Sequence, residues 1–250
     1  MRGRRALRVP AVVYEVWWER LGLGVMPFPL VVFQHGADSD ERGRARAWAE
    51  GWVAWHGLGD ELAEALRVVA DHDIELALVH TDREGQNRIG CFRKGRSVLR
   101  VVLHGDSVEL AWLADTSLPS AAVGALPVRG AGRGQSAQVP VEALTKCGDD
   151  WKRSGLISDG VAALIDVGAD RLQAQRFLTV YSAADAMGQA SAVQPRQGRS
   201  AALSTDPLSW LDTGEGRYVT TVNGGQVTLA PVSAAALGTR FAELLTGSFT

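Results

Sequence analysis

The clearest structural signal of the chain lies in residues 74–112, IELALVHTDREGQNRIGCFRKGRSVLRVVLHGDSVELAW. Apolar residues recur there with a period of two, which is typical of strands. The segments between them are rich in Gly, Asp, Asn and Arg, as turns are. The pattern predicts an antiparallel meander of four strands, with these bounds: Ile74–Thr81, Arg88–Phe92, Ser97–Leu103 and Ser107–Trp112.

Helical spacing dominates the residues before this meander. A first helix is expected from Pro10, which suits the first helical position, to the glycines at 22 and 24. Pro29–Phe33 (PLVVF) then predicts a buried strand. Two further helices are expected after Asp38 and after Asp60, paired antiparallel across a short glycine turn. The first of this pair carries an apolar stripe that is expected to be core: Ala45, Trp48, Ala49, Trp52 and Trp55.

The second part of the chain repeats the order of the first. Each part has helices, an antiparallel meander and a closing helix; strand Arg217–Val222 corresponds to Arg96–Leu103. A segment rich in Gly and Arg, Val128–Gln135 (VRGAGRGQ), separates the parts and is expected to be a linker. The sequence thus predicts an α+β fold with a central antiparallel sheet flanked by two helical bundles. The expected domain spans 1–250 as two pseudo-twofold related halves, about 1–127 and 136–250.

Composition narrows the functional classes. Hydrophobic residues make up 46% of the chain and charged residues 22%, and the formal net charge is −2. A chain so nearly neutral has no global field to attract nucleic acid or an anionic membrane. Glu15 interrupts the first apolar run, and no stretch of 18 apolar residues follows, so neither a signal peptide nor a membrane span is expected. These features predict a cytoplasmic protein.

Catalytic and metal-binding motifs are absent from the sequence. It has no G-x-S-x-G, no H-E-x-x-H and no phosphate-binding loop ending in Lys-Ser or Lys-Thr. Cys91 and Cys147 lack the C-x-x-C spacing of zinc sites. We therefore expect no catalytic residue, no metal and no cofactor. The alternative that stays open is an enzyme with a dispersed site made of His80, Asp82 and Cys91.

Several segments, in their order along the chain, resemble the EspG family of secretion-associated chaperones from mycobacteria and related actinobacteria. They are Trp17–Gly24 (WWERLGLG), Gly188–Gln189, Trp210–Thr213 (WLDT), Gly216–Tyr218 (GRY) and Val227–Pro231 (VTLAP). The resemblance covers nearly the whole chain. After Gly188–Gln189 the family pattern has a large apolar residue and a second glycine, whereas this chain has Ala190 and Ser191.

The resemblance implies an ATP-independent chaperone without cofactor. Its implied partner is a helical PPE protein paired with PE, kept soluble for type VII (ESX) secretion, and the chain is expected to form a homodimer while no partner is bound. The implied partner surface combines the sheet, the loop between the second and third strands, and the carboxy-terminal bundle. That loop, Asp82–Asn87, is either a finger that reaches the partner or a solvated tip. The expected contacts are Arg83, Glu84, Gln86, Asn87, Gln189, Arg217 and Phe241.

Overall fold

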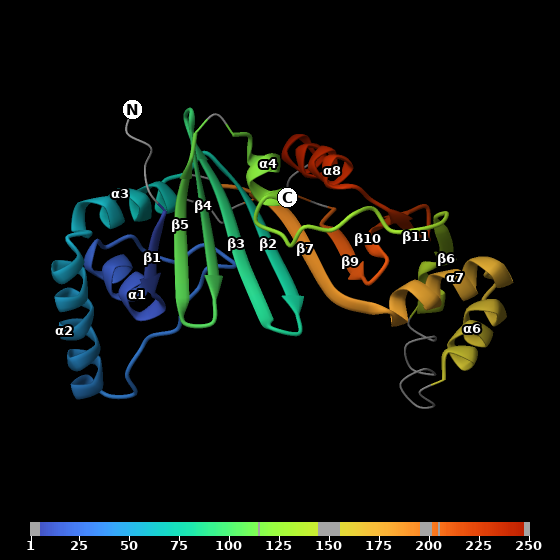
Figure 1. The fold of residues 1–250 in the computed structure, drawn as a ribbon, viewed down its shortest axis with the longest axis horizontal. Coiled ribbons are helices and arrows are strands. Elements are labelled where there is room, and N and C mark those ends of the chain that lie inside the picture. Colours follow the sequence, from blue (N-terminus) through green and yellow to red (C-terminus); the bar gives the residue numbers. More distant parts are fainter. Residues whose placement is uncertain (1–5, 115, 145–155, 196–201, 205, 248–250) are drawn as a thin grey trace.

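One antiparallel sheet organises the molecule. The structure is a computed structural model that describes residues 6–114, 116–144, 156–195, 202–204 and 206–247. Within these residues eleven strands pair in the order β1-β5-β4-β3-β2-β7-β9-β10-β11-β6, with β8 beside β7 (Figure 1). The strands are β1 Leu7–Pro10, β2 Ile74–Asp82, β3 Gly85–Lys94, β4 Ser97–His104, β5 Ser107–Leu113, β6 Ala137–Pro140, β7 Ala184–Gln194, β8 Ala202–Leu203, β9 Leu208–Thr213, β10 Gly216–Asn223 and β11 Gln226–Pro231.

The strand order is the same in both directions from the central β2–β7 pair. Outward from β2 come β3, β4, β5 and then the early strand β1; outward from β7 come β9, β10, β11 and then the early strand β6. The outermost strands have similar sequences, LRVP and AQVP, and the same alternation of burial. The predicted α+β class with a central antiparallel sheet is confirmed. The shared order also supports our proposal of two similar halves.

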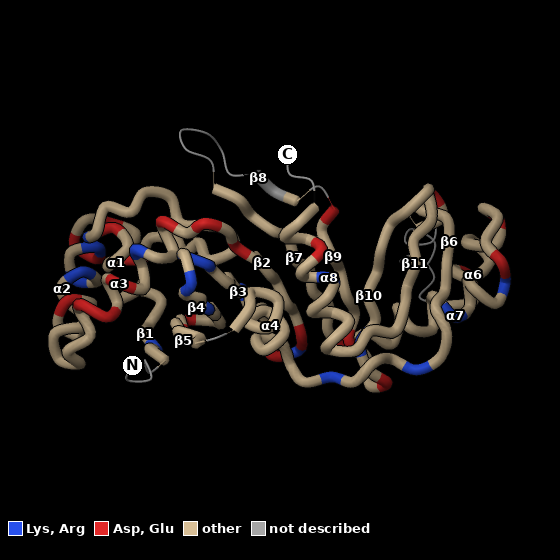
Figure 2. Tube along the Cα trace, turned by 90° about the horizontal axis from the view of Figure 1, so that it is seen from above, with Lys and Arg blue, Asp and Glu red and all other residues tan. Residues whose placement is uncertain are grey.

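The helices form three groups on the two faces of the sheet. On one face, α1 (Ala11–Arg20), α2 (Ser39–His56) and α3 (Gly59–Ala70) lie at the amino-terminal end of the sheet, as Figure 1 shows in blue to teal. At the other end lie α6 (Ile157–Asp166) and α7 (Arg171–Ser182). The opposite face is covered at its centre by α4 (Leu118–Val123) and α8 (Ala234–Thr246), which pack on each other. Figure 2 shows α4 and α8 on one side of the central strands and α1 to α3 on the other.

Strand alternation shows that the two terminal groups share a face. Side chains of neighbouring strand residues point to opposite faces. On β9, Trp210 belongs to the core under α4 and α8, whereas Leu211 belongs to the core under α6 and α7. On β3, Cys91 belongs to the α4 and α8 core, whereas Phe92 packs under α1 to α3. The register pairs these strands through β2 and β7, so Phe92 and Leu211 lie on the same face.

The strand predicted at Pro29–Phe33 is not present. The segment is irregular: the Leu30 amide donates to the Pro27 carbonyl at 2.9 Å, and two other backbone groups bond to side chains. The Val32 amide donates to Met26 Sδ at 3.4 Å, and the Val31 carbonyl accepts from the Arg88 guanidinium at 2.5 Å. Of its five residues, only Pro29 and Leu30 are buried. An apolar run alone therefore did not distinguish an ordered loop from a strand.

The expected antiparallel pairing of α2 with α3 is wrong. Asp38 caps α2 as predicted, accepting from the Asp40 and Glu41 amides. However, α2 packs on α1, while α3 packs on α1, β3 and β4, and Figure 1 shows α2 and α3 diverging from their shared turn. The predicted apolar stripe is core only in part: Ala49 is buried and Trp52 packs against the core, but Trp48 and Trp55 are 51% and 87% exposed. The buried residues of α2 are Arg42, Ala49 and Val53.

The segment 128–135 is bound to the carboxy-terminal half. Ala131 forms an isolated bridge with Arg217, and the Arg133 carbonyl accepts from the Tyr218 hydroxyl at 3.1 Å. Gly132 lies flat on the Tyr218 ring, where a Cβ would stand 2.2 Å from a ring carbon. The expected linker is thus packed against β10. Among the described residues, no helix is both long and apolar enough to cross a bilayer.

Candidate functional site

The centre of the sheet is uncovered on the face that carries α1 to α3 and α6 and α7. We call this surface the open face. The register places Arg88, Val79, Gln189, Ser209 and Thr220 in one row across β3, β2, β7, β9 and β10. All five side chains are at least partly exposed. The open face is completed by Thr81, Met187 and Val222.

The open face is nearly uncharged, because Arg88 is the one charged side chain among the eight residues named above. Its central strand β7 contains one charged residue, Asp185, as its tan trace in Figure 2 shows. Met187 is 53% exposed and Val222 is 68% exposed, between neutral polar side chains. Such a surface has contact area and neutral hydrogen-bonding groups, but it has no cluster of acids and bases for chemistry.

The opposite side of β7 explains the glycine of the Gly188–Gln189 motif. The Trp210 indole occupies the space that a side chain at Gly188 would fill, with a ring carbon 2.1 Å from an added Cβ. Gln189 therefore points to the open face while its neighbour accommodates the core. Of the two departures from the family pattern, Ala190 is buried in the core and Ser191 lies on the open-face side.

The connection between β2 and β3 is a tight hairpin, not the long loop that the sequence predicted. The ladder continues to the pair Asp82–Gly85, so only Arg83 and Glu84 form the turn. The Asp82 carboxylate accepts from the Glu84 amide at 2.8 Å, and Gly85 has a φ of 130°, which favours glycine. Gln86 lies on the open face beside Thr81.

The other expected contacts divide between surface and interior. Arg83 and Glu84 are exposed at the hairpin tip, and Asn87 points away from the open face beside His80. Arg217 is buried, and its Nε and Nη2 donate to the two Asp212 oxygens at 2.6 and 2.7 Å. Phe241 is also buried, edge-on to Trp210 with ring centroids 6.0 Å apart. Neither of these two side chains is accessible, so we exclude both from the surface.

The three residues of the enzyme alternative do not converge. His80 Nε2 lies 3.8 Å from Asp82 Oδ2, beside a hollow of about 190 Å³. Burial lowers the pKa of His80, so its ring is neutral at pH 7. Cys91 pairs with Leu76, four residues from His80 along β2, or about 13 Å at strand rise. Burial raises the pKa of Cys91 to about 12, which leaves an unreactive thiol.

Metal ligation finds no support in the described residues. No three His, Cys, Asp or Glu side chains among them are arranged to hold a metal ion. The acids Asp38 and Glu41 at the start of α2 act locally: Asp38 caps the helix, and Glu41 accepts from the Ala37 amide at 2.8 Å. Cys147 lies outside the described residues.

Most of the open face was not predicted from the sequence. Gln86 and Gln189 were, but Val79, Met187 and Thr220 were not. In β2 both faces are buried from Ile74 to Leu78. The partly exposed Val79 is as apolar as those residues, so the sequence did not mark it as a surface residue. The sequence signal that was available is in β7, where the polar residues Gln189 and Ser191 alternate with the apolar residues Ala190 and Ala192.

The fold and the open face define a class: an α+β protein with one antiparallel sheet whose uncovered centre lies between two helical groups. The EspG family model matches residues 11–243, so the chain belongs to the EspG family. The fold is similar to that of the Mycobacterium tuberculosis type VII secretion system chaperone EspG5, solved in complex with a PE25–PPE41 dimer. The TM-score is 0.70 at 14% identity, with 96% of each chain covered. No curated protein sequence matches the chain significantly.

Proposed function

We propose that this chain is a cytoplasmic chaperone that binds a PE/PPE-like helical pair and keeps it soluble for type VII secretion. The observation that carries the proposal is the open face, an exposed and nearly uncharged sheet surface in a member of the EspG family. The similar structure, EspG5, binds a PE25–PPE41 dimer. The proposed contact residues are Arg83, Glu84, Gln86 and Gln189, with Met187 and Val222 added from the structure.

Shielding of apolar surface is the proposed mechanism. An exposed apolar end on a secretion substrate favours aggregation, and its burial contributes about 25 cal/mol per Å². An interface of ordinary size, roughly 800 Å² on each partner, is sufficient for stable binding. Binding of this kind needs no nucleotide, metal or other cofactor, so we propose that the secretion machinery drives release.

Co-expression with a PE/PPE pair from the same genome tests this function. We expect the pair to remain soluble and to purify with the chain as a one-to-one-to-one complex. Free chain on the same column gives its own oligomeric state, which tests the expected homodimer. A pair that is equally soluble with and without the chain, and that elutes separately, would contradict the proposal.

A charge placed on the open face sharpens the test. Gln189→Lys puts an unpaired cation at the centre of the open face and should weaken the complex at least tenfold. The matched control is Gln226→Lys on β11. Val227 and Leu229 point to the side of the sheet that carries the open face, so the exposed Gln226 points to the opposite side. Equal loss of binding in both variants would show that the effect is not specific to the open face.

A further inference from the structure

The connection between α1 and α2 exposes large apolar side chains. It runs from Leu21 to Asp38, 18 residues without helix or strand, and we call it the aromatic loop. Val25, Phe28 and Phe33 are 93%, 68% and 84% exposed. Irregular connections longer than about 15 residues are uncommon and usually functional or disordered. From Leu21 to Ala37 the loop has no formally charged side chain.

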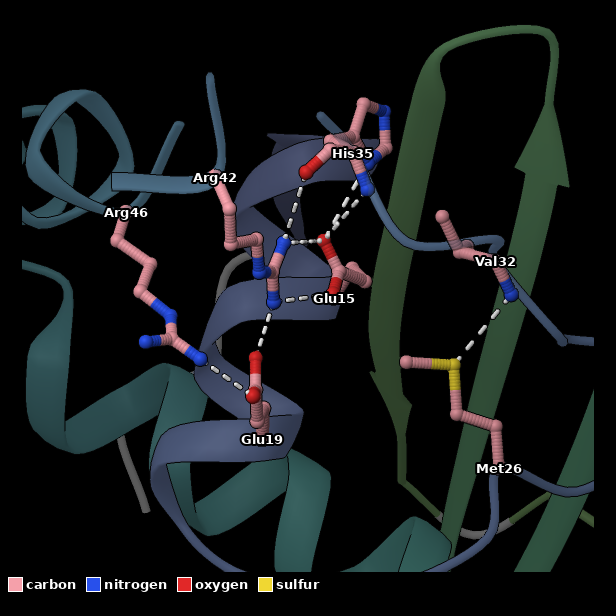
Figure 3. Close-up of polar contacts among 7 residues, drawn as sticks. All are labelled: Glu15, Glu19, Met26, Val32, His35, Arg42 and Arg46. Carbon is pink, nitrogen blue, oxygen red and sulfur yellow. Dashed lines mark hydrogen bonds and ion pairs between the residues drawn. The ribbon is translucent and has the colours of Figure 1, made fainter. Parts of the chain in front are cut away.

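Specific contacts hold the aromatic loop in place, which distinguishes it from a disordered connection. His35 lies against the buried Glu15 carboxylate, with its amide 3.4 Å and its Nδ1 3.3 Å from Oε2 (Figure 3). Arg42 donates to the same carboxylate at 2.7 and 2.6 Å and to the His35 carbonyl at 3.3 Å. Gly36 has a φ of 97° and lies so close to α2 that an added Cβ would be 2.6 Å from the backbone nitrogen of Arg42.

The middle of the aromatic loop is anchored at the edge of the open face. Arg88, the β3 member of the open-face row, donates to the Val31 carbonyl at 2.5 Å. Leu30 is fully buried and lies against Gly90, where an added Cβ would be 3.0 Å from Leu30 Cδ1. Gly90 pairs with Ala77 on β2, two positions along from the Val79–Arg88 pair and on the same face of the sheet. The aromatic loop is therefore continuous with the open face.

We propose that the aromatic loop is a preformed extension of the open face and binds the same partner, with Phe28 and Phe33 as its apolar contacts. This inference rests on the proposed function. The occupant to which it commits is the apolar end of the helical secretion substrate. Two features favour that occupant: the loop lies next to the open face, and its uncharged surface matches an uncharged, apolar partner surface.

Order in the free chain is what makes the exposed rings useful for binding. A flexible loop must lose conformational entropy when it binds, whereas a loop already fixed at Leu30, Val31 and His35 loses little. Aromatic side chains bury large areas with few rotatable bonds and are enriched among the residues that dominate binding energies. Exposed phenylalanines also reduce solubility of the free chain, a cost that a binding role explains.

The test is the double variant Phe28→Ser, Phe33→Ser in the full chain, with affinity for the PE/PPE pair as the readout. We expect at least a tenfold higher Kd, with a melting temperature within about 2 °C of the parent because both rings are already exposed. Trp55→Ser is the control, since Trp55 is an equally exposed aromatic on α2 outside the loop, and it should leave the Kd unchanged. An unchanged Kd in the double variant overturns the proposal.

Photocrosslinking separates direct contact from an indirect effect. A benzoylphenylalanine placed at position 28 should crosslink to the substrate, and one placed at position 55 should not. If the parent chain does not bind the pair at all, the proposed function fails. If the parent binds but the loop variants bind equally well and do not crosslink, the proposed function stands and this inference alone fails.

Discussion

Glu15 is a buried carboxylate that joins three separate segments of the chain. It lies on α1, pairs with Arg42 on α2 and accepts from His35 on the aromatic loop. The Glu15 and Arg42 side chains are only 7% and 8% exposed. The Arg42 guanidinium also donates to Glu19, and this hydrogen bond is the largest cause of the lowered pKa of Glu19. A single guanidinium thus fixes both the helix pair and the loop.

Loss of that guanidinium should be severe. Arg42→Met leaves the Glu15 charge buried without its partner, and such breaks cost about 3–5 kcal/mol. Urea unfolding measures the loss. The control is Arg46→Met, because the Arg46–Glu19 pair is about half exposed and such pairs contribute roughly 0.2–1 kcal/mol. Comparable losses in the two variants would contradict the assigned role of burial.

Glu75 predicts a pH dependence of stability. It is fully buried on β2, neither carboxylate oxygen has a hydrogen-bond partner among the described residues, and His72 Nε2 is 3.7 Å away. Burial raises the pKa of Glu75 well above its usual value, so the folded chain holds a proton that the unfolded chain releases near pH 4.3. The contribution of Glu75 to stability is therefore complete below that pH and decreases as pH rises.

The variant Glu75→Gln tests the direction of this pH dependence, because it removes the titrating group but keeps the shape of the side chain. We expect it to be more stable than the parent at pH 7, with the difference shrinking toward zero near pH 4. The slope of the difference should not exceed about 1.4 kcal/mol per pH unit, the value for one proton. Urea midpoints between pH 4 and 7.5 give the curve. A less stable variant at pH 7 would mean that the charged carboxylate stabilises the fold.

At the scale of elements, the segment 128–135 is part of the packed structure. Gly132→Ala should cost about 1–3 kcal/mol, because the Tyr218 ring occupies the space that the methyl group needs. Gly130→Ala is the matched control, since nothing lies within 4 Å of a Cβ there. Thermal unfolding of both variants distinguishes the cases. If this segment were a free linker in solution, both substitutions would be harmless.

Strand and helix elements were largely predictable, whereas their surroundings were not. The meander from Ile74 and the cap Asp38 follow local rules of period and hydrogen bonding, and the structure has them. The exposed Trp55 and the buried Arg217 depend on which faces meet in the folded chain. A sequence pattern shows that a face exists, but not what covers it. Most of the open face was missed for that reason.

At the scale of the whole molecule, the sheet continues through the middle of the chain. The β2–β7 pair joins the two proposed halves over seven paired residues. The core under α4 and α8 also draws from both, with Leu76 and Leu118 from the first half and Trp210 and Phe241 from the second. Cutting the chain between the halves would expose two sheet edges and divide that core. We therefore propose that neither half is stable alone.

Calorimetry tests this dependence. If the halves share one core, the chain should unfold in a single transition, and the calorimetric enthalpy should equal the van't Hoff enthalpy. Fragments 1–127 and 136–250, expressed separately, should aggregate or lack cooperative melting, because each exposes an unpaired central strand, β2 or β7. Mixed fragments provide the complementary test, since pairing of β2 with β7 should restore cooperative melting. Two resolved transitions in the intact chain, or a fragment that melts cooperatively by itself, would show that the central strand pair is an interface between independent domains.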